Sequence, residues 1–188
     1  MENLLTTCGN EGRLRDYDHF GVEPRLRLPL ALLGVRTESE VGVRAHFETQ
    51  ERRQVNGDTP TARTGVTVED NRRENRALSA FVQERLLLGD FVLSGGVRLE
   101  SVTYERTNRL ANGGAGATGT SDLLQWVPGV GLAWAPSERL NLFAGVHRGF
   151  APPRTEDVIS NSGGVVDLDA ELSWNSEIGL RALVRPGV

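Results

Sequence analysis

Apolar and polar residues alternate most regularly near the end of the chain, over residues 171–184. The even positions are apolar except for Ser176, and the odd positions are polar or small up to Leu183. A period of two predicts a β-strand with one face toward an apolar medium and the other toward water or polar groups. The strand would be about fourteen residues long, more than the usual five or six of a soluble strand and enough to cross a bilayer at a tilt.

Six further stretches show the same alternation and are predicted as strands. They cover residues 22–32, 40–50, 77–88, 91–107, 123–135 and 140–149. In the first of them the even positions are apolar and the odd positions carry the charges. In 77–88 both faces carry apolar residues, so the pattern does not assign its faces. Gly89-Asp90 predicts a two-residue hairpin turn between two of these strands.

The predicted connections alternate between short and long. Residues 1–20 are interpreted as a loop, longer hydrophilic loops are predicted at 53–76, 108–122 and 150–170, and short turns at 33–38, 89–90, 136–139 and from 185 onward. A meander with tight turns at one rim and long loops at the other is typical of outer-membrane barrels. Single-chain bacterial barrels close with an even number of strands, so a count of seven predicts that the chain is a fragment.

Aromatic residues fit the same interpretation. Trp126 and Trp134 share the apolar face of one predicted strand, roughly 26 Å apart along it and about 20 Å apart after a tilt near 40°. That span is close to the apolar band of about 25 Å between aromatic girdles. Trp174 is expected in the belt on the loop side and Phe91 in the belt on the turn side. A soluble β-sandwich alternates in the same way, but strand length and loop asymmetry favour the membrane.

Composition excludes several other classes. Hydrophobic residues make up 38% of the chain, and no apolar run approaches the roughly eighteen residues that a membrane helix needs. The net charge of -4 gives no excess of basic residues with which nucleic acid could be bound. Cys8 is the single cysteine, which excludes an internal disulfide and a multi-cysteine metal site. The sequence opens at Met1 without a signal-peptide pattern, and we interpret this as a missing natural N-terminus rather than as a cytosolic protein.

Particular segments resemble a known family. Asn141-Leu-Phe-Ala-Gly-Val-His-Arg-Gly-Phe-Ala-Pro-Pro153, a loop, and Glu171-Leu-Ser-Trp-Asn-Ser-Glu-Ile-Gly-Leu-Arg181 resemble the barrel of TonB-dependent outer-membrane receptors. The first strand ends in an Arg-Gly-Phe-x-x-Pro-type motif, and the second has a Glu-x-Gly-x-Arg core. Earlier strands of that barrel are similar to Phe81-Val-Gln, Gly96-Val-Arg-Leu-Glu100 and Pro128-Gly-Val-Gly-Leu132. The resemblance covers about residues 20–185. Within the family, these segments are most similar to those of receptors of the ferric citrate type.

This resemblance implies an all-β fold and an import function. We expect an antiparallel meander that forms a partial transmembrane β-barrel of about seven strands, with residues 1–188 as a barrel fragment that lacks the plug domain. The complete family barrel has about twenty-two strands and a plugged lumen. Its ligand would be ferric citrate or another ferric siderophore, bound at the outer face of a Gram-negative outer membrane. A TonB-type periplasmic coupling protein would supply energy through the missing N-terminal region, and no enzymatic activity or cofactor is expected.

Four arginines are the candidate ligand contacts. Arg72 and Arg73 lie in the predicted loop 53–76, and Arg148 and Arg154 flank the Pro-Pro corner. The planar guanidinium suits carboxylate ligands such as citrate or a siderophore. The alternatives are a solvated loop and pairing with lipopolysaccharide phosphate at the rim of the barrel.

Other polar groups have structural interpretations. Glu177 with Arg181, and Arg98 with Glu100, are expected to line a polar lumen. His46 and Glu48 point the same way, but two ligands without a third are a weak metal signal.

Two other function classes stay open. A barrel enzyme would use rim groups such as His147 and Asp157, although no Gly-x-Ser-x-Gly elbow is present. The third hypothesis is a soluble β-sandwich binding module. The pattern Gly114-x-Gly116-x-x-Gly119 matches a dinucleotide-binding motif, yet a β-patterned run rather than a helix follows it, so we interpret the match as accidental.

Overall fold

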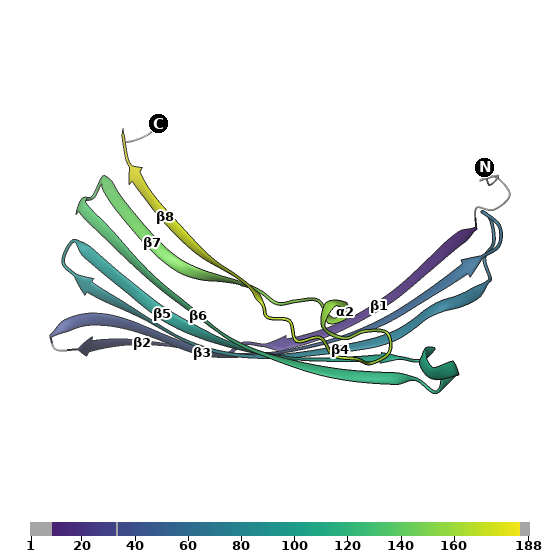
Figure 1. The fold of residues 1–188 in the computed structure, drawn as a ribbon. Coiled ribbons are helices and arrows are strands. Elements are labelled where there is room, and N and C mark those ends of the chain that lie inside the picture. Colours follow the sequence, from purple (N-terminus) through teal and green to yellow (C-terminus); the bar gives the residue numbers. More distant parts are fainter. Residues whose placement is uncertain (1–8, 33, 185–188) are drawn as a thin grey trace.

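Each strand of the chain pairs with its neighbours in an antiparallel sheet, and the sheet is curved into part of a barrel (Figure 1). The computed structural model describes residues 9–32 and 34–184. The all-β antiparallel meander predicted from the sequence is confirmed. The strands are β1 (Asn10–Val22), β2 (Arg25–Leu32), β3 (Val35–Gly57), β4 (Val66–Leu88), β5 (Phe91–Asn108), β6 (Ala117–Ser137), β7 (Leu140–Ala151) and β8 (Glu171–Ala182), with a 3-10 turn η1 (Ala111–Gly114) and a short helix α2 (Thr155–Val158).

The two strands β1 and β2 occupy one position at the edge of the sheet. Both pair with β3, Val22 opposite Ala45 and Arg25 opposite Gly42, so the register continues without a shift. The interruption falls at Pro24, which has no N–H to donate to the ladder. Its carbonyl still accepts a hydrogen bond from the Val43 amide at 3.2 Å. The sheet is therefore seven strands wide, as the alternation predicted.

Several strands are longer than predicted. The loop predicted over residues 1–20 is wrong from Asn10 onward, because β1 runs from there to Val22. The long loops predicted at 53–76 and 108–122 shrink to 58–65 and 109–116, since β3, β4 and β6 extend into them. The loop before β8 stays irregular over 152–170 apart from α2. Residues 1–8 of the predicted first loop and the turn predicted from 185 onward lie outside the described residues.

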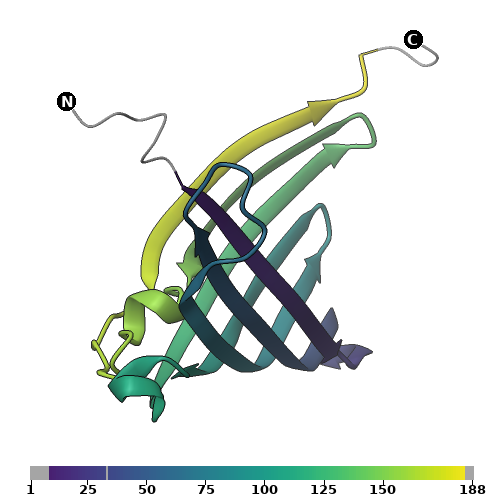
Figure 2. The same ribbon diagram turned by 90° about the vertical axis from the view of Figure 1, so that its right-hand side faces the viewer.

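The short and long connections lie at opposite ends of the strands. Figure 1 shows the turns after β2, β4 and β6 at the left and the β3–β4 and β5–β6 connections at the right, and Figure 2 gives the same strands from the side. Gly89 has a φ of 65°, which fits the predicted two-residue turn at Gly89-Asp90. We call these the turn end and the loop end of the sheet.

Strand parity assigns every side chain to one of two faces. In β5 the even residues Tyr104 and Arg106 lie against the segment 152–170, which Figure 1 places over the concave side of the sheet. We call this side the inner face and the convex side the outer face. Pairing then puts the even residues of β4 and the odd residues of β5 on the outer face, as in Val82 opposite Val97. This pairing assigns the two faces of the strand predicted at 77–88, which the sequence had left unassigned.

The outer face carries an apolar band near the turn end. In β4 it runs from Leu78 to Leu88, close to the 9–11 residues that a tilted spanning strand needs. Within residues 9–32 and 34–184 no second layer of protein covers its side chains: Ile178 of β8 is 89% exposed and Val43 of β3 is 50% exposed. An exposed apolar surface of this extent is suited to contact with lipid. It does not fit a β-sandwich, in which the apolar face would be buried against a second sheet.

One polar pair lies within this band. Glu84 of β4 and Ser39 of β3 are paired residues on the outer face, and the Ser39 hydroxyl donates to the Glu84 carboxylate at 2.5 Å. A hydrogen bond lowers the cost of placing a carboxyl group in an apolar medium.

Aromatic residues mark both limits of the band. At the turn end Phe91 and Trp134 stack with ring centroids 5.6 Å apart and planes 5° from parallel. At the loop end Trp126 and Trp174 lie on the outer face, 55% and 64% exposed. The sequence placed these four residues in the same two belts. Among the described residues, no helix is long and apolar enough to cross a membrane.

The inner face is polar, and on it two phenylalanine rings lie over glycines of the neighbouring strands. The Phe81 ring lies where a Cβ on Gly42 would stand, and Phe143 lies over Gly179 in the same way. Each ring carries an arginine: Arg25 lies 5.7 Å from the Phe81 centroid and Arg181 lies 5.6 Å from that of Phe143. Glycine lets the rings lie flat against the wall, which leaves the lumen open.

Arginine on the outer face should oppose assembly in lipid. For Val43→Arg and Ile178→Arg we expect a loss of about 2–4 kcal/mol each near the bilayer midplane. The matched control is Asn175→Arg, which changes the inner face of the same strand as Ile178. The measurement is urea unfolding of the barrel containing these strands, folded into lipid vesicles and followed by its heat-dependent gel mobility. Equal tolerance of arginine at Ile178 and Asn175 would show that the faces are assigned wrongly.

The aromatic belts can be tested by fluorescence. The emission of one tryptophan is obtained by subtracting the spectrum of the Trp126→Phe or Trp134→Phe variant from that of the parent protein. Lipids brominated near the headgroup should quench this emission. We expect weak quenching by iodide in water, because both rings face lipid. Strong iodide quenching with no effect of brominated lipid would place the two rings in the aqueous lumen instead.

Candidate functional site

The loop end of the sheet gathers most of the charged groups. Beyond the apolar band both faces of β3 and β4 are largely polar, as expected where strands continue past lipid into water. The predicted loop residues Arg72 and Arg73 therefore lie within β4 and point to opposite faces. Their adjacency in sequence does not make them a pair in space.

Arg73 is on the inner face and is 5% exposed. Its Nη1 donates to Glu156 Oε2 at 2.7 Å and to Gln50 Oε1 at 3.4 Å. Its Nη2 lies 3.8 Å from Glu69, and its Nε has no partner among the described residues. Glu156 belongs to α2, so this guanidinium joins the wall of the barrel to the loop after β7.

Arg72 is on the outer face and belongs to an exposed charge network. Its Nε donates to Glu74 at 2.7 Å and its Nη1 to Glu51 at 3.1 Å. Arg109, just after β5, bonds to the same Glu51 and to Asp70 at 2.8 Å. These two carboxylates, Glu51 first, raise the pKa of the Arg109 guanidinium. The network lies outside the barrel, directly above the apolar band.

Arg148 is also on the outer face. Its guanidinium lies 5.4 Å from the centre of the Trp126 ring and donates to the Trp126 carbonyl oxygen at 3.3 Å. In the ladder it stands opposite Trp174 of β8. A cation over an aromatic ring at the edge of the apolar band is suited to the headgroup region of a bilayer.

Arg154 precedes α2 and is the most exposed of the four candidates, with 78% of its side chain accessible. Its Nε donates to Asp157 Oδ2 at 3.2 Å. Figure 1 places α2, which this arginine directly precedes, over the concave side of the sheet. The four predicted arginines are thus divided: Arg73 lies on the inner face, Arg72 and Arg148 lie on the outer face, and Arg154 belongs to the segment between β7 and β8.

Sequence reasoning missed a second buried arginine. Arg106 of β5 is 6% exposed, and its Nη1 donates to the carbonyl oxygen of Ile159 at 2.7 Å. It also donates to Asn71 at 3.3 Å and to the side chain of Asn161. The parity of β5 could have placed Arg106 on the inner face. Nothing local could have identified its partners, of which Asn71 lies 35 residues away in the chain, Ile159 53 and Asn161 55.

These groups enclose a polar cavity between the wall and the loop. Its volume is about 560 Å³. Three arginines and two glutamates contribute to its lining, with asparagine side chains between them: Arg52, Arg73, Arg106, Glu69, Glu156, Asn71, Asn108 and Asn161. Arg52 lies 3.1 Å from Glu69 and 3.9 Å from Glu156. Since most of these charges are paired with one another, the cavity holds the loop in place more than it offers free charges.

The remaining sequence candidates lie on the inner face nearer the turn end. Arg98 donates to Glu100 in the expected ladder. Glu177 and Arg181 share the inner face of β8, and Arg181 stacks on Phe143.

The two histidine candidates are less informative. His46 Nε2 lies 4.0 Å from Glu48, and in the described part of the chain no three metal-ligating side chains gather. His147 lies on the inner face of β7. The glycine pattern at 114–119 is followed by β6 rather than a helix, so the interpretation of that match as accidental is confirmed.

Comparisons with known proteins agree with this architecture. A family model described as TonB dependent receptor-like, beta-barrel, matches residues 4–187. The solved structure of the unliganded ferric citrate transporter FecA matches with a TM-score of 0.79 and 18% identity, over 92% of this chain and 26% of that chain. The solved structure of the siderophore receptor PiuA from Acinetobacter baumannii matches with a TM-score of 0.68 and 13% identity, over 89% of this chain and 29% of that chain.

The ferric-catecholate import receptor Fiu from E. coli K12 is similar, with a TM-score of 0.66 and 18% identity over 90% of this chain and 29% of that chain. A search of curated proteins gave no match. The chain spans about a quarter of the length of the FecA structure. At these identities the solved structures support the fold, while the family follows from the match over nearly the whole chain. The chain belongs to the family of TonB-dependent receptor β-barrels.

Proposed function

We propose that this chain forms part of an outer-membrane receptor that imports a ferric chelate, either ferric citrate or another ferric siderophore. Members of its family are outer-membrane β-barrel receptors of Gram-negative bacteria. The single observation that supports a chelate ligand is an exposed arginine, Arg154, on a segment that is docked over the concave side of the sheet. Ferric citrate and many siderophores present carboxylate or other anionic oxygens, which a guanidinium binds with two parallel hydrogen bonds.

Arg154 is the side chain to which we assign ligand contact. It is accessible, the helix α2 that it precedes lies over the concave side of the sheet, and its partner Asp157 is itself partly exposed. An exposed ion pair of this kind contributes little and can exchange for a ligand carboxylate at small cost. Arg73 is buried and paired with Glu156, so we assign it a supporting role behind Arg154.

The remaining parts of the receptor follow from the same proposal. A sheet seven strands wide with open edges requires further strands to close a barrel, and the matched FecA structure is about four times as long. We propose that those strands, a plug and the segment that contacts a TonB-type coupling protein belong to the same receptor, with residues 1–188 as a barrel fragment. Energy coupling would then act through the plug rather than through the strands described above.

The two outer arginines suit a different partner. Arg148 stands at the upper aromatic belt and Arg72 lies above it, where the phosphates of lipopolysaccharide would be in a Gram-negative outer membrane. We propose that they contact this lipid and take no part in binding the chelate. We propose no catalytic role for the chain, since import moves the chelate without breaking a covalent bond.

Removal of the exposed arginine should weaken chelate binding. For Arg154→Ala in the complete receptor we expect about a 10-fold or greater rise in the Kd for ferric citrate, because a hydrogen bond to a charged group contributes about 1.5–3 kcal/mol. The measurement is isothermal titration in detergent with ferric citrate and with a ferric catecholate as separate probes. Arg148→Ala is the control and should leave both Kd values unchanged. Equal effects of the two substitutions would contradict the assignment of Arg154 to the ligand.

A further inference from the structure

The ladder between β6 and β7 ends well before either strand does. Its last pair toward the loop end is Gly129 opposite His147, although β6 begins at Ala117 and β7 runs on to Ala151. Over the same stretch β6 stays paired with β5 on its other side. Figure 1 shows β6 reaching toward η1 while β7 turns to α2. In the described structure, one side of β6 is therefore a free strand edge within the sheet.

Alternate residues of β6 direct their backbone groups to opposite neighbours. The Ala135 amide donates to the carbonyl oxygen of Asp90, beside β5, at 2.8 Å. The Val130 carbonyl oxygen lies toward β7, 3.5 Å from the position that a Cβ on Gly145 would take. In an antiparallel strand the N–H and C=O of one residue point to the same side. The even residues of β6 thus face β7, and the odd residues face β5.

Pro128 explains where the ladder stops. It is an even residue, and it has no N–H to donate to β7 at the first position beyond the last pair. Two residues further on, the Trp126 carbonyl oxygen accepts from the Arg148 side chain at 3.3 Å in place of a backbone donor. The Arg148 guanidinium therefore marks the base of the opening between the two strands.

Three residues of β6 turn their backbone groups to this opening, namely Thr120, Asp122 and Leu124. In the part of the chain that the structure describes, no backbone group is hydrogen-bonded to their N–H or C=O on this side. All three are exposed. They lie beyond Trp126 of the loop-end belt, where strands meet water instead of lipid. A row of unpaired donors and acceptors is a template for pairing with another strand.

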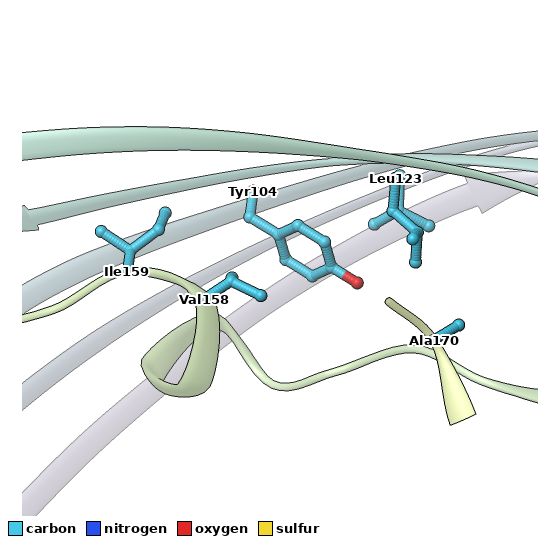
Figure 3. Close-up of a cluster of buried hydrophobic side chains, with 6 residues drawn as sticks. Tyr104, Leu123, Val158, Ile159 and Ala170 are labelled. Atoms are coloured by element: carbon cyan, nitrogen blue, oxygen red, sulfur yellow. The ribbon is translucent and has the colours of Figure 1, made fainter. Parts of the chain in front are cut away.

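The border of the opening is acidic. It is formed by residues 118–127, 148–151 and 165–171, the last because Ala170 belongs to the same buried cluster as Leu123 (Figure 3). These stretches contain one basic residue, Arg148, and four acidic ones, Asp122, Asp167, Asp169 and Glu171. A strand that carries lysine or arginine would be attracted to this border, and an acidic strand would be repelled.

We propose that the free edge of β6 at Thr120, Asp122 and Leu124 binds an extended, basic peptide segment of another protein by strand addition. The peptide backbone supplies the hydrogen bonds that β7 does not supply, and its basic side chains meet the acidic border. The site is separate from the chelate contact assigned to Arg154, and its test requires no chelate. Two other occupants, a second copy of the chain and the receptor's own segment 152–170, give different results in the same tests.

Amide exchange in the complete receptor shows whether the edge is open. Over residues 120–125 the even amides should exchange with deuterium about 100-fold or more faster than the odd amides, which are hydrogen-bonded to β5. The measurement is NMR of the receptor in lipid nanodiscs without any peptide. Equal rates for even and odd amides would overturn the proposal. Slow exchange throughout would place segment 152–170 or a second copy on the edge, and would also overturn it.

A peptide of defined sequence tests the occupant. The probe is a fluorescein-labelled peptide of about eight residues in which lysine and threonine alternate, titrated by fluorescence anisotropy into the receptor in zwitterionic nanodiscs. Its binding should slow the exchange of the even amides. The same peptide with every backbone nitrogen methylated keeps its charges but donates no backbone hydrogen bond, so its Kd should be about 10-fold higher or more. A peptide of alternating glutamate and threonine should also bind about 10-fold more weakly.

Two substitutions at one position locate the bound peptide. Leu124→Pro removes an N–H from the free edge, and it leaves the ladder to β5 intact because the Leu124 amide does not face β5. It should raise the Kd of the lysine–threonine peptide about 10-fold. The matched control Leu124→Ala should change this Kd by less than about 2-fold. Heat-dependent gel mobility checks that each variant is folded, and the methylated peptide tests the same hydrogen bonds in the unchanged receptor.

Each contrary result overturns the proposal. No binding of the lysine–threonine peptide, equal binding of its methylated form, or equal Kd values for Leu124→Pro and Leu124→Ala would each do so. A parent receptor that sediments as a dimer and a Leu124→Pro variant that sediments as a monomer would assign the edge to a second copy instead. A receptor that binds this peptide but neither ferric citrate nor a ferric catecholate would contradict the proposed function and leave the strand-addition site standing.

Discussion

The need to pair every backbone N–H and C=O within an apolar medium governs this structure. Lipid offers no hydrogen bonds, so a chain can cross it with strands only where each strand is paired on both sides. The ladder from β3 through β7 meets that requirement over most of the apolar band, with β6 and β7 paired from Gly129 and His147 toward the turn end. At the edge, Pro24 interrupts the ladder without a change of register. Once the backbone is satisfied, side chains divide by parity into an apolar outer face and a polar inner face.

The same constraint relaxes where the strands leave the band. β3 and β4 continue well past it, and there the outer face carries Glu51, Arg72 and Glu74 instead of leucine and valine. Water can solvate these groups, so their ion pairs are exposed and individually weak. The inner face at the same level is different. Docking of the loop removes water there, and Arg73 and Arg106 become buried with specific partners.

Function in this barrel therefore depends on which side of a strand a residue occupies. Arg72 and Arg73 are neighbours in sequence, yet one belongs to an exposed charge network on the outer face and the other holds the segment that carries Arg154. A β-strand gives two adjacent residues entirely separate environments. A cluster of arginines read along the chain is a poor guide to a binding site, and the parity of each arginine within its strand is a better one.

The sequence by itself determined the all-β meander, the turn at Gly89-Asp90, the aromatic belts and the family, because each of these is encoded in local alternation, turn residues or short motifs. It failed for residues 10–20, 53–57, 66–76 and 117–122, where polar residues occur on both faces of the strands and the period of two disappears. The contacts of Arg106 with Ile159 and Asn161, and the burial of α2 against Tyr104, were decided only by the tertiary structure. They join residues more than fifty positions apart, and no local pattern specifies where a loop returns to a wall.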